Sequence, residues 1–268
     1  MAKQDEFERI LQVAINELEL NAEEKASLFE RIAQETIGLM IYGSRARGDH
    51  IASSDFDLLR LSRFPFSTFK IDRVSVSSYS PEQLMSANRT LFGTHILRDG
   101  RIIFDPHGEL ARILNTLKPA DPKDLLDTVR RYSIILNQPF EEKLAYTSGL
   151  VRLARYMLRT AVYAKAMIAG APCFSVRELA ERFEDPMLAT LLASDPQIVE
   201  VPSIELLDEL TGRLINIIGP LPINNYGSIS GIAVSAWESD RNLAALAVRA
   251  TSEDKATLSY TDLPKVLL

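Results

Sequence analysis

The chain has 268 residues, of which 46% are hydrophobic and 25% are charged. This length and apolar content predict an ordinary globular protein with one large domain or two small ones. The net charge of −6 excludes a general attraction to nucleic-acid backbones but leaves room for a local basic patch.

Cysteine use and hydropathy indicate the compartment. Cys173 is the single cysteine, which excludes a disulfide within the chain and favours a reducing cytoplasm. The polar, acidic first residues do not resemble a secretory signal. The apolar stretch over residues 158–171 is interrupted by Arg159 and Lys165, so we expect no membrane span and no membrane partner. We therefore expect a cytoplasmic protein.

Two helices are predicted at the start of the chain, over residues 5–34. Apolar residues recur there at helical spacing, and Asn21 followed by Glu24 is a start signal for the second helix. Residues 37–44 are apolar and partly β-branched, and they predict a buried strand that stops at Gly43.

A polar loop follows, and then the second strand is predicted over residues 55–62. A third strand is predicted over residues 70–79. Pro81 is expected to open a helix, because proline suits the first helical turn. A further strand is predicted over residues 101–105, and His95, just before it, is expected to be a structural histidine.

The second half of the chain has a different pattern. A Pro- and Asp-rich connection follows Pro119, and the pattern from residue 125 to about 192 is mostly helical. Further helices are predicted over residues 205–218 and 233–248. We therefore predict an α/β (α+β) domain over residues 1–118 and a helical domain over residues 119–268.

The segment between the first two strands carries the predicted chemistry. Gly43 permits a close approach of the backbone to a ligand. A helix beginning after Ser44 would present free N–H groups, and the hydroxyl of Ser44, to a phosphate. Arg45 and Arg47 would add positive charge beside a triphosphate. Either arginine could instead be a solvated helix residue or a partner of Asp49.

Asp55 and Asp57 are the candidate metal ligands and catalytic residues. Side chains two apart in a strand share a face, so both carboxylates would converge while Phe56 points into the core. Two carboxylates completed by substrate phosphates and water suit Mg²⁺. Metal and triphosphate would then lie together, as metal-assisted nucleotidyl transfer requires.

The pattern G-S-R-A-R-G, followed by D-F-D-L with Asp55 eleven positions after Ser44, resembles the signature of the DNA polymerase β-type nucleotidyltransferase superfamily. It is especially similar to small bacterial members, the aminoglycoside and the minimal toxin–antitoxin nucleotidyltransferases. The resemblance covers about residues 37–105. It implies a nucleotidyltransferase-like mixed sheet with helices, followed in many members by a C-terminal helical bundle, and magnesium-dependent use of an NTP.

The resemblance also implies a third carboxylate on a later strand, and here the chain departs from the pattern. The position of that acid falls on Ser75, which strand parity places on the open face, opposite to the valines on either side of it. Asp72 is the nearest acid and shares the parity of those valines. It could serve only if the strand begins later or contains a bulge.

A row of arginines in the helical half has two interpretations. Arg152, Arg155 and Arg159 lie at i, i+3 and i+7 on one helical face. We expect a solvated or acid-paired face. The alternative is a face that contacts the triphosphate or the acceptor.

The predicted function is transfer of a nucleoside monophosphate from an NTP to an acceptor, with release of pyrophosphate. The sequence does not identify the acceptor, which could be a small molecule, a tRNA or other RNA, or a protein. The alternative is a nucleotide-binding regulatory module with reduced catalysis, acting through a partner protein, because Ser75 replaces the third carboxylate.

Overall fold

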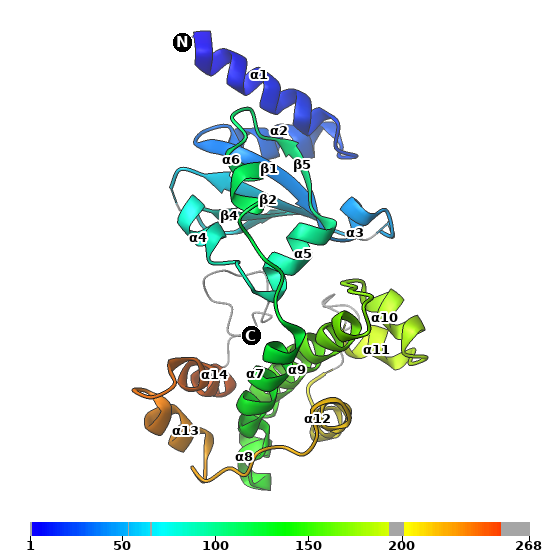
Figure 1. The fold of residues 1–268 in the computed structure, drawn as a ribbon, viewed down its shortest axis with the longest axis vertical. Helices are drawn as coiled ribbons and strands as arrows, with labels where there is room; N and C mark the ends of the chain where they lie inside the picture. The colour runs from blue at the N-terminus through cyan, green and yellow to red at the C-terminus, as the bar shows by residue number, and fades with distance from the viewer. Residues whose placement is uncertain (1, 53, 65, 193–200, 253–268) are drawn as a thin grey trace. The chain divides into compact units, whose positions relative to one another are not determined.

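The computed structural model describes residues 2–52, 54–64, 66–192 and 201–252. These residues fall into two compact units, one up to Ala120 and one from Asp121 onward (Figure 1). The first unit is built on a five-stranded mixed sheet and the second is helical, which confirms the predicted fold class. No helix in the described ranges is long and apolar enough to cross a membrane.

The first unit begins with helices α1 (Ala2–Asn16) and α2 (Ala22–Ile32). The start of α2 confirms the predicted signal. Asn21 Oδ1 accepts a hydrogen bond from the Glu24 backbone N–H at 2.8 Å, and Glu24 Oε2 accepts one from the Asn21 N–H at 2.8 Å. This reciprocal cap satisfies two N–H groups that the helix itself leaves without partners.

The sheet has the strand order β3-β4-β2-β1-β5. Strands β2 and β4 run parallel, whereas the pairs β1–β2, β1–β5 and β3–β4 are antiparallel. The strands are β1 (Thr36–Tyr42), β2 (Phe56–Ser62), β3 (Phe69–Ile71), β4 (Val74–Tyr79) and β5 (Arg101–Phe104).

The prediction of a single strand over residues 70–79 is wrong, because the structure forms a hairpin there. β3 ends at Ile71, β4 begins at Val74, and these two residues pair across a two-residue turn. Asp72 occupies the first turn position with φ 46°, a left-handed conformation that breaks the alternation of a strand. The exposed Asp72 therefore lies in a turn and not on either face of the sheet.

Short helices connect the later strands. The helix predicted at Pro81 is brief, α4 (Pro81–Met85), and α5 (Leu91–Asp99) begins after the cap residue Thr90. His95 lies within α5 and not in a connection before β5. Helix α6 (Glu109–Leu114) follows β5, and Leu110 of α6 packs against Gly38 of β1.

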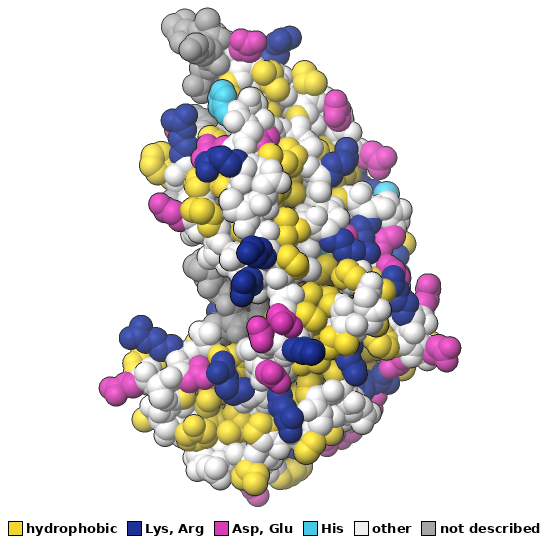
Figure 2. Space-filling model, viewed as in Figure 1, with side chains coloured by type: hydrophobic (Ala, Val, Ile, Leu, Met, Phe, Trp, Pro, Cys, Tyr) yellow, Lys and Arg dark blue, Asp and Glu magenta, His cyan; other side chains and the backbone are white. Residues whose placement is uncertain are grey.

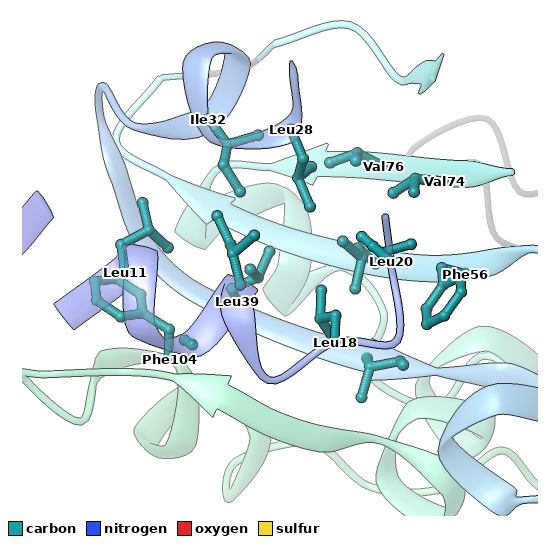
Figure 3. Packing of buried hydrophobic residues seen from close by; sticks show 14 residues of the cluster. Leu11, Leu18, Leu20, Leu28, Ile32, Leu39, Phe56, Val74, Val76 and Phe104 are labelled. Atoms are coloured by element: carbon teal, nitrogen blue, oxygen red, sulfur yellow. The ribbon is translucent and has the colours of Figure 1, made fainter. Parts of the chain in front are cut away.

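One face of the sheet packs against α1 and α2 and forms the core shown in Figure 3. Phe56 of β2 and the two valines of β4, Val74 and Val76, point into this core (Figure 3). Leu58 of β2 belongs to the same buried cluster. Because side chains alternate along a strand, the residues between them face the other side of the sheet. That side carries Asp57 and Ser75.

The second unit is arranged around the long helix α9. Helix α9 (Thr147–Ile168) contacts α7, α12 and α14 and buries most of its length. The other helices are α7 (Pro122–Tyr132), α8 (Phe140–Ala145), α10 (Val176–Arg182), α11 (Met187–Leu191), α12 (Ile204–Ile218), α13 (Ile229–Ala236) and α14 (Arg241–Thr251), with a 3₁₀ turn at Ser133–Leu136.

Figure 2 shows acidic and basic side chains interspersed over the visible face, among exposed apolar ones.

The part of the α9 arginine row formed by Arg155 and Arg159 is not the solvated face that was one of the expectations from the sequence. Arg155 and Arg159 are buried and donate to the carbonyls of Leu191 and Leu192, at the end of α11. Arg152 donates to the Ser252 carbonyl at 2.7 Å, at the end of α14. The last carbonyls of a helix lack partners within it, so these guanidinium groups cap helix ends within the second unit.

Candidate functional site

The two predicted metal ligands flank the start of β2. Asp57 is the second residue of the strand and Asp55 immediately precedes it. Phe56, between them, is 2% exposed and packs into the core, so the strand turns the two carboxylates toward the opposite side. The structure therefore brings Asp55 and Asp57 together, as the alternation predicts.

Asp57 has an unusual charge environment. Burial, together with the neighbouring charge of Asp55, raises the pKa of Asp57 to about 7. Lys70 and Arg47 act in the opposite direction because their positive charges favour the carboxylate. A cation bound between the two carboxylates would remove this unfavourable repulsion on Asp57.

The turn after β1 is in direct contact with this carboxyl pair. Tyr42, the last residue of β1, pairs with Asp57 across the antiparallel ladder. Gly43 follows with φ 76°, and a Cβ atom built on it would lie 2.6 Å from Asp57 Oδ2. Glycine is required here both for its backbone conformation and for the space that the Asp57 carboxylate occupies.

Gly43 also begins the short helix α3 (Gly43–Arg47), which holds three further predicted nucleotide-binding residues. Ser44 lies half-buried in its first turn, and the Ser44 carbonyl accepts from the Gly48 N–H at 2.9 Å. The turn and the start of α3 thus lie beside the carboxylates, at the end of β1, the strand that pairs with β2.

Arg45 is directed away from the carboxylates. Its guanidinium donates to the Ser54 carbonyl at 3.2 Å and lies 4.4 Å from the centroid of the Phe56 ring. It also forms an ion pair with Glu19 at 3.6 Å. Since Phe56 points into the core, this arginine supports the side of the sheet opposite to Asp57. Its predicted contact with a nucleotide stays a prediction.

Arg47 lies close enough to Asp57 for its charge to lower the pKa of that carboxyl. Its guanidinium is held by two other carboxylates. Arg47 Nη1 donates to Asp99 Oδ2 at 2.9 Å, and Nε donates to Asp49 Oδ1 at 3.2 Å. The predicted pairing with Asp49 is therefore present, together with a buried partner that the sequence did not indicate.

That buried partner belongs to a network on α5. Asp99 Oδ2 also lies 3.4 Å from His95 Nε2. Burial lowers the pKa of His95, and Asp99 only partly offsets this. For Asp99 itself burial acts to raise the pKa, but the bonds to His95 and Arg47 outweigh it and hold the pKa below its usual value. The i,i+4 spacing of His95 and Asp99 was a detectable signal for this pair.

The third-carboxylate position contains a serine. Asp57 of β2 pairs in register with Ser75 of β4, and Ser75 pairs with Lys70 of β3 on its other side. Lys70 Nζ donates to Asp55 Oδ2 at 2.7 Å. Sequence reasoning missed Lys70, because its place beside Ser75 follows from the hairpin and not from a continuous strand.

The donor set at this place is thus two carboxylates. Among the residues that the structure describes, no group of three or more His, Cys, Asp and Glu side chains could hold a metal ion. Mg²⁺ commonly takes only one or two carboxylates from a protein and completes its shell with water and substrate phosphates. The Asp55–Asp57 pair fits such a shared site and does not fit a cage made by protein alone.

The comparisons with known proteins add little to this geometry. No protein-family model matches the chain, and no curated protein matches it. Among solved structures, the chain is similar to a nucleotidyltransferase-like protein from Exiguobacterium sibiricum 255-15. The two are 18% identical, over 82% of this chain and 80% of that chain, with a TM-score of 0.31. A similarity at this level supports no conclusion about activity.

Proposed function

We propose that this protein is a magnesium-dependent nucleotidyltransferase. In the reaction, an acceptor oxygen forms a bond to the α-phosphorus of an NTP. The bond from that phosphorus to the bridging oxygen of the β-phosphate breaks, and pyrophosphate leaves with the electron pair. The proton of the acceptor passes to water.

Each site residue has a role in this proposal. Asp55 and Asp57 hold the metal ion, which when bound neutralises charge that develops on the leaving pyrophosphate. Gly43 and Ser44 hold the triphosphate at the start of α3, and Arg47 adds positive charge near Asp57. Arg45 reaches the nucleotide in this proposal only if it leaves the ring of Phe56.

The observation that carries the proposal is the contact between the Gly43 turn and Asp57. Two sequence elements, the glycine turn and the D-x-D strand, meet so closely that a Cβ atom added to Gly43 would lie 2.6 Å from Asp57 Oδ2. A ligand bound against the turn therefore also lies against the carboxylates. Phosphate binding and metal binding at one place are the joint requirement of phosphoryl and nucleotidyl transfer.

The proposal is tested by incubating the protein with each of the four NTPs, labelled at the α-phosphate, with Mg²⁺. One set contains the protein alone, a second contains total RNA, and a third contains a mixture of small hydroxyl-bearing acceptors. We expect the α-label in one acceptor and pyrophosphate in solution. Asp57→Asn is the control. If no label moves in any set, or if Asp57→Asn transfers it as well as the wild type, transfer at this site is refuted.

The second candidate function is a nucleotide-binding regulatory module that acts through a partner protein. It is favoured by Ser75 at the third-carboxylate position and by the engagement of Asp55 with Lys70. This candidate predicts magnesium-dependent NTP binding without release of pyrophosphate. Equilibrium binding of a non-hydrolysable NTP analogue, measured beside the transfer assay, separates the two functions.

A further inference from the structure

The carboxylate Asp55 already has a cation. Lys70 Nζ lies 2.7 Å from Asp55 Oδ2, with the lysine side chain 55% exposed and that of Asp55 39% exposed. The lysine comes from β3, the edge strand of the sheet, and reaches past β4 to Asp55, just before the start of β2.

Strand register explains how the lysine comes to lie there. Lys70 pairs with Ser75, and Ser75 pairs with Asp57, so the three residues form a row across neighbouring strands. An acidic side chain in the middle of this row would pair with Lys70 itself. Ser75 carries no charge, and the ammonium group extends instead to Asp55.

The contact bears directly on metal binding. The Asp55 oxygen that accepts from the ammonium group has one of its two lone pairs engaged, and a divalent cation beside that ammonium is repelled by it. Lys70 has a long, half-exposed side chain, so it can move into solvent without unfolding the strand. The pair therefore resembles a closed state of the site that a cation opens by displacement.

We propose that Lys70 is an internal counter-ion of Asp55, which a divalent cation must displace before it binds Asp55 and Asp57. This inference rests on the proposed metal site. It assigns Lys70 a regulatory part in that site: the lysine keeps Asp55 neutralised while the site is without metal, and it weakens the binding of bare metal ions.

The test measures binding of Mn²⁺ alone, which accepts the same oxygen ligands as Mg²⁺ and whose free ion is counted by electron paramagnetic resonance. Lys70→Met and Lys70→Gln remove the charge. An exposed ion pair supplies a modest stabilisation, so we expect both variants to bind Mn²⁺ about fivefold more tightly than the wild type. Lys70→Arg keeps the charge and is expected to bind as the wild type does.

Lys118→Met is the matched control, because it removes one positive charge from an exposed position of the same unit. We expect no change from it. The double variant Lys70→Met with Asp55→Asn should lose the gain in affinity. Thermal unfolding followed by circular dichroism identifies any variant that fails to fold. If only one of Lys70→Met and Lys70→Gln folds, that variant alone decides the test.

The outcomes separate the two proposals. If Lys70→Met and Lys70→Gln bind Mn²⁺ no more tightly than the wild type, or if Lys118→Met gains as much, the counter-ion role is refuted and the metal site stands. Weaker binding in the Lys70 variants also refutes it. If neither the wild type nor any variant binds Mn²⁺, the metal site and the counter-ion role both fall.

Discussion

Replacement of Gly43 by alanine tests the junction on which the proposed site depends. Gly43 has φ 76°, and the new Cβ atom would lie 2.6 Å from Asp57 Oδ2. The left-handed conformation costs an alanine about 1–2 kcal/mol. The Asp57 carboxylate must also move, because a Cβ atom and an oxygen that is not bonded to it do not approach to this distance.

Gly108→Ala separates the backbone cost from the contact. Gly108 has φ 68°, and among the described residues no atom beyond its chain neighbours would lie within 4 Å of a Cβ added there. The Gly108→Ala variant should therefore have a free energy of unfolding lower by about 1–2 kcal/mol and should keep its full activity. Gly43→Ala should lose at least as much and also reduce transfer about a hundredfold, since small displacements of catalytic groups are costly.

The assays are urea unfolding, for the free energy of unfolding, and release of pyrophosphate from the NTP used. Gly43→Ala should also bind Mn²⁺ less tightly, because Asp57 is displaced. The reasoning is refuted if Gly43→Ala and Gly108→Ala lose equal stability while Gly43→Ala keeps near-normal transfer. In that case the contact with Gly43 does not position Asp57.

Three further predictions concern the carboxylates. The pKa of Asp57 is raised from 3.8 to about 7, so the folded protein binds more protons than the unfolded chain between these values, and this residue's contribution to stability falls as pH rises from about 4 to 7. Asp57→Asn should remove this pH dependence. The measurement is the free energy of unfolding of both proteins, from urea unfolding at several pH values. If the two free energies change with pH in the same way, Asp57 titrates normally. The NTP should bind weakly without a divalent ion, because the ion that would bridge the triphosphate to Asp55 and Asp57 is then missing and the carboxylate of Asp57 repels the phosphates. Equal affinity with and without Mg²⁺ in calorimetric titrations would contradict the metal assignment. Ser75→Asp should raise Mg²⁺ affinity, because it adds an oxygen ligand beside Asp57. Asp72→Ala should have little effect, because Asp72 lies in the β3–β4 turn. A loss of Mg²⁺ binding in Asp72→Ala would show that Asp72 is a ligand.

The sequence alone determined the local parts of the site. The alternation of Asp55, Phe56 and Asp57 fixes which side chains enter the core, because a strand has a period of two. The position of Gly43 directly after an apolar strand predicted a turn there. Both features depend on residues close together in the chain, and the structure shows both.

Which cation lies near these carboxylates was decided by the tertiary structure. The contact of Lys70 with Asp55 depends on the hairpin at Asp72 and on the parallel pairing of β4 with β2, and neither is encoded in a local hydrophobic pattern. The direction of Arg45 toward Phe56 likewise depends on packing against the core.

Buried polar pairs show the same dependence on long-range packing. Arg47 reaches Asp99 on α5, and Arg155 reaches the end of α11, so each guanidinium finds its partner far away in the sequence. A spacing of charges within one helix shows which residues share a face, but the neighbouring element decides whether that face is solvated or buried. The burial of a charged group needs a partner at the right place, and only the folded chain supplies that place.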